Sequence, residues 1–152
     1  MAAAATPSAA EGARCGAAGG GAESAEGGAA LPAGVVLTRL LQDVVPGLQL
    51  AAEAEQPLLT AAGLRVKRIV STGQATPAGE WYEQDDHELC VVLAGSGSLV
   101  FEGRKEPVRL LAGDALYLPR GVRHRVESTS TTEPTVWLAL HHDGPAGLAV
   151  AL

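Results

Sequence analysis

The sequence predicts a single all-β domain, a small sandwich or barrel, and three observations support that prediction. Short runs of alternating and β-branched residues recur through the second half of the chain, and glycine-containing turns separate them at regular spacing. No amphipathic helical pattern lies between these runs. The 152 residues are enough for one domain with a hydrophobic core and too few for two ordinary ones.

The two ends of the chain are predicted to lie outside that domain. Residues 1–34 are almost entirely Ala and Gly, so they are expected to be a disordered tail that buries too little surface to fold. Residues 35–142 form the predicted barrel domain, and residues 143–152 a loose C-terminal tail. The first tail lacks the apolar run of a secretory signal, and its acids outnumber its single arginine, which argues against organelle import. Its Ala richness leaves import open as an alternative.

Composition excludes several classes of function. The net charge is −6, and the eleven Lys and Arg residues form no single basic block, so nucleic acid is not an expected partner. No run of about 18 apolar residues occurs, so no membrane-spanning helix is expected. The two cysteines, Cys15 and Cys90, do not form a disulfide framework, which predicts a reducing, cytoplasmic location.

The region before the regular strands is the least decided. Residues 31–50 are apolar in part and are broken by Pro46, so they are expected to form either a short helix or an edge strand. Residues 53–63 stay ambiguous, although Pro57 argues against a long helix there.

The strands that follow are short, with alternating or mainly apolar residues, and turns containing Gly, Pro, Asp or Ser bound most of them. They are predicted at residues 64–70, 80–84, 87–93, 98–102, 107–111, 115–118, 122–127 and 135–141.

A tight corner at residues 113–124 organises the second half of the chain. Asp114 is expected to cap its first turn, and Pro119 and Gly121 force a second reversal. His124 follows on a strand where it shares the apolar, inward face with its neighbours two positions away. An inward histidine on a short strand is either a satisfied core residue or part of a site.

The spacings of this corner, together with those around Glu88, resemble the two motifs of the cupin superfamily. The second motif is matched by Gly113, Pro119, Gly121 and His124. In the first motif, Glu88 and Gly95 match, whereas Tyr82 and Gln84 stand where the family has two histidines. The resemblance covers roughly residues 58–142 and is closest to small single-domain cupins with a type-2 conserved barrel. It implies a β-barrel of the double-stranded β-helix, or jelly-roll, type.

The resemblance also implies where a site would lie. In the family, imidazoles and one carboxylate hold a divalent metal such as Fe, Mn, Ni or Zn, with open positions for substrate or oxygen. Carried over, the metal ligands are Glu88 and His124, with Gln84 as a third, and the ligand pocket is formed by Tyr82, Gln84, Glu88 and His124. The alternative is that these four side chains form a buried, hydrogen-bonded polar cluster without metal. A third alternative has His87 replacing a missing ligand.

Strand parity gives expectations for the remaining candidates. His87 is adjacent to Glu88, so it faces the opposite way and is expected at the surface or rim, and a metal shared by the two would need a bulge. Cys90 shares the parity of Glu88 and is expected to be an inward, unreactive filler. His141 shares the parity of Trp137 and is expected either in solvent or lining the barrel end.

The function expected from these observations is the binding of a small polar molecule inside the barrel. The alternative is a metal-dependent dioxygenase, isomerase or lyase acting on a small organic acid or a sugar-derived substrate. Neither the catalytic residues nor the ligand follow from the sequence. The resemblance also implies a homodimer as a candidate assembly, with residues 35–50 as the candidate contact.

Overall fold

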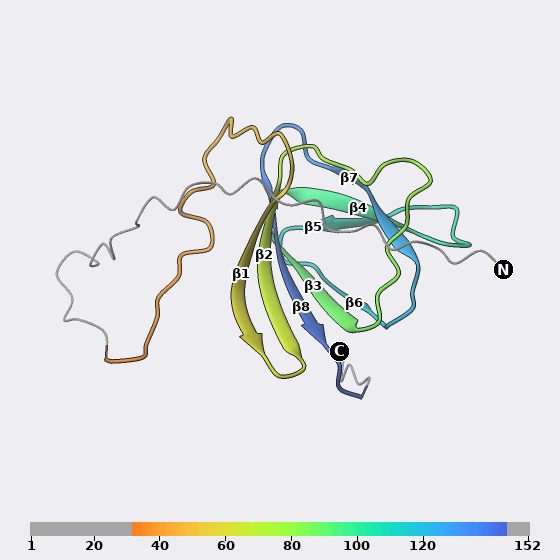
Figure 1. The fold of residues 1–152 in the computed structure, drawn as a ribbon. Helices are drawn as coiled ribbons and strands as arrows, with labels where there is room; N and C mark the ends of the chain where they lie inside the picture. Colours follow the sequence, from red (N-terminus) through yellow and green to blue (C-terminus); the bar gives the residue numbers. More distant parts are fainter. Residues whose placement is uncertain (1–31, 146–152) are drawn as a thin grey trace. The chain divides into compact units, whose positions relative to one another are not determined.

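The computed structural model describes residues 32–145, which form eight β-strands and no α-helix (Figure 1). In chain order the strands are β1 (Ala54–Ala61), β2 (Leu64–Ser71), β3 (His87–Ala94), β4 (Ser96–Phe101), β5 (Val108–Leu111), β6 (Ala115–Leu118), β7 (His124–Thr129) and β8 (Thr135–His142). The predicted all-β class is confirmed, and no described segment is a helix able to cross a membrane. The predicted tails, 1–34 and 143–152, fall largely outside the described residues.

The strands form two antiparallel sheets that face each other (Figure 1). The larger sheet has the order β1-β2-β8-β3-β6 and the smaller one the order β5-β4-β7. Strands far apart in the chain therefore pair, since β8 lies between β2 and β3. The register places Glu88 of β3 opposite both His141 of β8 and Leu118 of β6. Side chains of three strands thus meet on one inner face.

The hydrophobic core fills the space between the sheets. Alternate residues of each strand point inward, as the period of two requires. The buried cluster consists of Cys90, Val92, Leu99, Leu110, Leu118 and Trp137. Polar inward residues, described below, occupy the ends of the same strands.

Two glycines allow the sheets to approach closely where β3 and β4 meet. A Cβ on Gly97 would lie 2.5 Å from two ring atoms of Trp137, so only a glycine leaves room for that ring. The ring is held by the Trp137 Nε1–H, which donates to Ser71 Oγ at 3.2 Å. Gly95, in the preceding turn, has a φ of +70° and would place a Cβ 2.5 Å from the Pro134 carbonyl oxygen. Gly95, which belongs to the first sequence motif, is thus required both by its backbone conformation and by the lack of space for a Cβ.

The region before β2 differs from the expectation. Residues 32–50 form turns, and neither the expected helix nor the expected edge strand is present. The chain divides into two units after Thr38, so residues 32–38 are described apart from the rest. In the second unit, Asp43 accepts from the guanidinium of Arg68, which anchors the segment to β2. The local hydrogen bonds of this segment are those of turns, from the Val44 N–H to the Leu41 carbonyl and from the Leu48 N–H to the Val45 carbonyl, both at 3.2 Å.

Several strand limits also differ from the predicted ranges; β4, for example, begins at Ser96 rather than at residue 98. Residues 54–61, left ambiguous by the sequence, form the edge strand β1, and Pro57 sits at a register shift where an edge strand tolerates it. Residues 80–84 do not form a strand, because only Tyr82 makes an isolated bridge, with His124. β7 begins at His124 rather than at residue 122.

Candidate functional site

A cavity of about 240 Å³ opens between the two sheets, and all of the predicted pocket residues line it. They are Tyr82, Gln84, Glu88 and His124. Apolar side chains, among them Leu118 and Trp137, form the rest of the wall. The structure therefore brings the predicted residues together, and their role in binding stays a prediction.

Glu88 is the central carboxylate of the cavity. It is only 9% exposed, because β6 and β8 flank it on both sides. Its Oε2 accepts a hydrogen bond from Gln84 Nε2 at 2.6 Å. The backbone carbonyl of Gln84 accepts a hydrogen bond from the Gly121 N–H at 2.8 Å. The corner at residues 113–124 therefore fixes the loop that carries Gln84. One carboxylate oxygen is thus engaged, and Oε1 is left toward the cavity wall formed by β8.

His124 presents one ring nitrogen to the cavity. Its Nδ1 lies 2.9 Å from the Val122 carbonyl oxygen, which can only accept, so Nδ1 carries the proton. In the neutral imidazole, Nε2 is then an acceptor. Tyr82 lies beside it at the more exposed side of the cavity, with ring centroids 5.8 Å apart. Two backbone hydrogen bonds between Tyr82 and His124 hold the pair in register.

His141 belongs to the same site, although it was not among the predicted pocket residues. It is 8% exposed, lines the cavity, and has its Nε2 4.0 Å from Glu88 Oε1. That Nε2 has no hydrogen-bond partner among the described residues. The Nδ1 lies 3.5 Å from Asp86 Oδ1, and Asp86 forms an ion pair with Arg65. Of the two expectations for His141, the structure shows the one that lines the barrel end.

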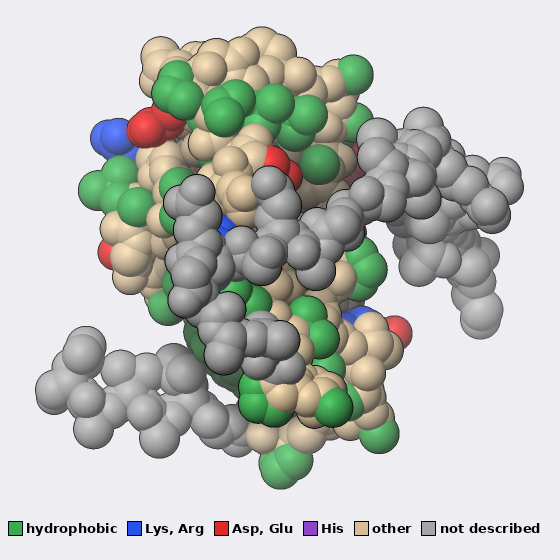
Figure 2. Space-filling view, turned by 90° about the vertical axis from the view of Figure 1, so that its left-hand side faces the viewer, with side chains coloured by type: hydrophobic (Ala, Val, Ile, Leu, Met, Phe, Trp, Pro, Cys, Tyr) green, Lys and Arg blue, Asp and Glu red, His purple; other side chains and the backbone are tan. Residues whose placement is uncertain are grey.

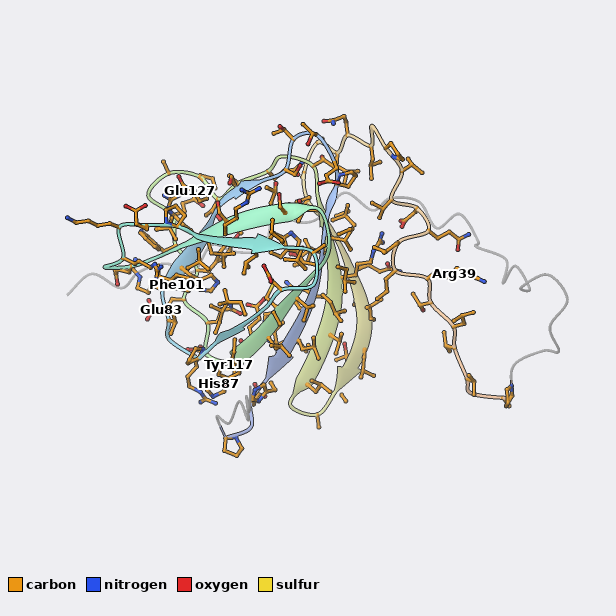
Figure 3. The ribbon with its side chains drawn as sticks, turned by 180° about the vertical axis from the view of Figure 1, so that it is seen from behind. Arg39, Glu83, His87, Phe101, Tyr117 and Glu127 are labelled. Carbon is orange, nitrogen blue, oxygen red and sulfur yellow. The ribbon has the colours of Figure 1, made fainter. Side chains whose placement is uncertain are left out.

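His87 corrects a prediction. It faces away from Glu88, as its parity requires, but it is buried at 4% exposed rather than lying at the surface or rim. Tyr117 Oη lies 2.9 Å from its Nδ1, Arg120 Nε donates to its Nε2 at 3.2 Å, and the His142 ring stacks 5.0 Å away. Figure 3 shows His87 and Tyr117 together at one end of the larger sheet.

The surroundings of His87 affect its charge and exclude it from the cavity. Burial lowers the pKa of His87, and the nearby charges of Arg120 and His142 lower it further, against a smaller raising effect of Asp86. The pairing of β3 with β8 is regular at His87, because its register shift lies between Val92 and Ala94. The bulge that would turn His87 toward Glu88 is therefore absent at that position, and the alternative that His87 replaces a missing metal ligand is wrong.

Cys90 lines the cavity as the expected filler. Burial raises the pKa of its thiol to about 12, and the neighbouring charge of Glu88 acts in the same direction. The thiol therefore stays protonated at neutral pH.

The donor set does not fit the divalent metal that the fold family implies. Tyr82 and Gln84 replace the family's imidazoles, and Gln84 already occupies one oxygen of Glu88. Within residues 32–145, no group of three His, Cys, Asp or Glu side chains is arranged to hold a metal ion. Glu88, His124 and His141 all line the cavity, but their donor atoms are not arranged around one point as the three protein ligands of a catalytic metal site are.

Comparison with known proteins identifies the family. The Cupin domain family matches residues 69–141. A protein from Ralstonia eutropha JMP134, provisionally named a mannose-6-phosphate isomerase, is 42% identical, with a TM-score of 0.67 over 72% of this chain and 100% of that one. No curated protein matches.

Two more distant structures share the fold alone. One is a cupin superfamily protein from Desulfitobacterium hafniense DCB-2, 13% identical, with a TM-score of 0.53 over 64% of this chain and 83% of that one. The other is an RmlC-like cupin with a double-stranded β-helix from Methanocaldococcus jannaschii, 16% identical, with a TM-score of 0.51 over 64% and 88%. Two antiparallel sheets around a polar cavity thus define a jelly-roll barrel. The chain belongs to the cupin superfamily.

Proposed function

We propose that this cupin binds a small polar molecule in its barrel cavity. The observation that carries the proposal is the orphaned Nε2 of His141, buried 4.0 Å from Glu88 Oε1. Buried polar groups are nearly always hydrogen-bonded, and an unsatisfied one costs about 1–3 kcal/mol. A ligand that donates a hydrogen bond to this atom removes that cost. The cavity lies below the ~300–1,000 Å³ of sites for drug-sized ligands, so the ligand is small.

Thermal unfolding of the full chain with a panel of sugars, polyols and small carboxylates tests this proposal. A ligand present at 100 times its Kd stabilises the folded state by about 2.7 kcal/mol, which is a readily measured rise in Tm. We expect at least one such compound, and we expect its effect to disappear in Glu88→Gln. Glu106→Gln is the matched control, because Glu106 lies in the turn between β4 and β5 and is exposed. A panel without a stabilising compound, or a stabilisation unchanged in Glu88→Gln, contradicts the proposal.

The second candidate is an isomerase acting on a sugar-derived substrate. It is favoured by the 42% identity to the protein provisionally named a mannose-6-phosphate isomerase, which is matched over the whole length of that protein. Isomerisation of a hydroxycarbonyl compound moves a proton between adjacent carbons and needs a positioned base. Glu88 Oε1 and His141 Nε2, 4.0 Å apart in the cavity, are the groups able to do so. Conversion of mannose 6-phosphate or mannose by the wild type, lost in Glu88→Gln, would establish it; no conversion of either sugar would refute it.

A metal-dependent version of this alternative would use Glu88, His124 and Gln84. Because Gln84 hydrogen-bonds Glu88 in the structure, it would have to turn its amide oxygen toward the metal and release that carboxylate. Metal analysis of protein purified without an affinity tag tests this version. Stoichiometric Fe, Mn, Ni or Zn that is lost in His124→Ala would support it, and metal-free protein would contradict it.

We also propose a homodimer through residues 35–50. Val35 and Val36 in the first unit, and Leu41 and Val45 in the second, are exposed apolar side chains. Figure 2 shows hydrophobic side chains at several places on the face that it views, with acidic and basic side chains among them. Light scattering during size exclusion should give a dimer that Leu41→Glu weakens, and a monomeric wild type would contradict the proposal. A cytoplasmic location, with neither nucleic acid nor membrane as partner, stays a prediction from composition.

A further inference from the structure

The hydrogen-bonding capacity of the cavity points to the class of its ligand, provided that the cavity binds one as proposed above. Two imidazoles face it. His124 uses its Nδ1–H on the Val122 carbonyl, and His141 directs its Nδ1 at the Asp86 carboxylate, 3.5 Å away. A neutral imidazole in either place therefore carries its proton on Nδ1, which leaves Nε2 as an acceptor.

The third buried polar group of the cavity is also an acceptor. Glu88 is nine-tenths buried, and a carboxylate accepts hydrogen bonds only. Gln84 has two N–H donors, one of which is used on Glu88 Oε2, and the hydroxyl of Tyr82, at the exposed side of the cavity, can donate or accept. His141 Nε2 and Glu88 Oε1 thus form a pair of acceptors 4.0 Å apart, with no donor between them in the described part of the chain. Adjacent hydroxyl groups of one ligand could donate to one atom each.

The charges around the cavity also favour a ligand that is not an anion. Three carboxylates line it against one cation: Glu53, Glu55 and Glu88 against Lys67. Lys67 Nζ lies 3.1 Å from Glu55 Oε2, so the only cation among these residues is already compensated. An anionic ligand would meet net negative charge without a cation to pair with.

The neighbouring cavity does not supply the missing cation. Its volume is about 460 Å³, and it shares Lys67, Gln84 and His141 with the first. Arg65 lines it, but Arg65 is paired with Asp86, and Asp85 and Asp143 lie on the same wall. A phosphate or carboxylate reaching out of the barrel would again meet more acids than bases.

We infer that the cavity takes a small ligand rich in hydrogen-bond donors and free of anionic groups. Hydroxyl groups of a polyol and the ammonium group of an amino sugar share this chemistry. A phosphorylated sugar or a sugar acid does not. For the isomerase alternative, the inference assigns an unphosphorylated sugar as the substrate.

Four compounds with one carbon skeleton separate these classes. They are D-mannose, D-mannosamine, mannonate and mannose 6-phosphate, titrated calorimetrically into the full chain at pH 7. We expect mannose or mannosamine to bind, mannosamine more tightly if charge dominates, and both anions to bind at least about tenfold more weakly, a difference of about 1.4 kcal/mol. Anions that bind as tightly as the uncharged sugar overturn the inference and leave the proposed function standing. No binding by any of the four also overturns it, and the proposed function then falls only if the wider panel fails.

A variant and a spectrum provide two further checks. Glu55→Gln, at an exposed position, releases Lys67 from its partner, so mannose 6-phosphate should bind at least about threefold more tightly than to wild type, while Glu106→Gln should leave it unchanged. The imidazole ¹⁵N shifts of His124 and His141 should show Nδ1–H tautomers at pH 8. Nε2–H tautomers in both rings, or an unchanged affinity in Glu55→Gln, would contradict the inference.

Discussion

Replacing Gly97 by Ala should destabilise the barrel, although glycine is usually a weak residue in a strand. Gly97 is not among the glycines with positive φ, so its backbone suits alanine. On backbone grounds alone, Gly97→Ala would stabilise the protein by about 0.4–1 kcal/mol, because it restricts the unfolded chain. Any destabilisation must therefore come from packing.

The packing cost follows from the position of Trp137. The added Cβ would lie 2.5 Å from Cη2 and Cζ2 of the indole, about 1 Å closer than ordinary contact between carbon atoms. The ring cannot retreat easily, since it is buried and its Nε1–H is bonded to Ser71 Oγ. Overpacking of a core costs about 1–3 kcal/mol, which lowers the Tm of a domain of this size by roughly 4–8 °C per kcal/mol.

Urea unfolding of a double-mutant cycle measures this effect. Trp137→Phe removes the two ring atoms that meet the new methyl group, so Gly97→Ala should cost little in that background. We expect a coupling energy of about 1–3 kcal/mol between the two positions. Gly97→Ala that leaves stability within about 0.5 kcal/mol of wild type, or that costs the same in both backgrounds, would refute the reasoning.

Three other predictions concern separate parts of the barrel. With a pKa of about 12, Cys90 in a Cys15→Ser background should react with iodoacetamide at pH 8 only in urea, and rapid labelling of folded protein would disagree. Because the pKa of His87 is lower in the folded protein than its ordinary 6.5, the unfolded chain binds the proton first, so the free energy of unfolding should fall as pH drops below 6.5. His87→Phe should reduce this fall in urea titrations between pH 8 and 5, and an unchanged pH dependence would count against the assignment. Gly95→Ala combines a φ of +70° with a Cβ 2.5 Å from the Pro134 carbonyl, so it should lower the Tm more than Gly97→Ala does, and a smaller effect would contradict this.

The sequence predicts the regular strands well because their signals are local. β3 and β8 are mainly continuous apolar runs with polar residues at their ends, and turns with Gly, Asp or Ser bound most strands. β1 lacks such a signal, since nearly all of it is exposed and Pro57 interrupts it. It becomes a strand because β2 offers a partner, which is a long-range effect that no local pattern shows.

The site can be predicted from the sequence where the alternation of a strand decides which side chains point into the barrel. Glu88 and His124 point inward, as alternation requires, and the structure places them in one cavity. His141 could be found by the same parity with Trp137, but a pair of histidines near a terminus usually lies in solvent, so lining of the barrel end was only the alternative. His87 has the predicted direction and the wrong burial, because Tyr117 and Arg120, about thirty residues away, cover it. The alternation of residues within a strand does not predict burial by residues that are distant in the sequence.

The central claim, that the barrel cavity is a small-molecule site, is tested most directly by titrating the ¹⁵N-labelled full chain with D-mannose and following the amide spectrum. We predict saturable shifts that are largest at the Gln84 side-chain amide and at the backbone amides of Glu88, His124 and His141. These residues line one cavity from four different segments of the chain. An absence of saturable shifts with D-mannose and with every compound of the wider panel, or shifts confined to Leu89 and Val91 on the opposite face of β3, would contradict the claim.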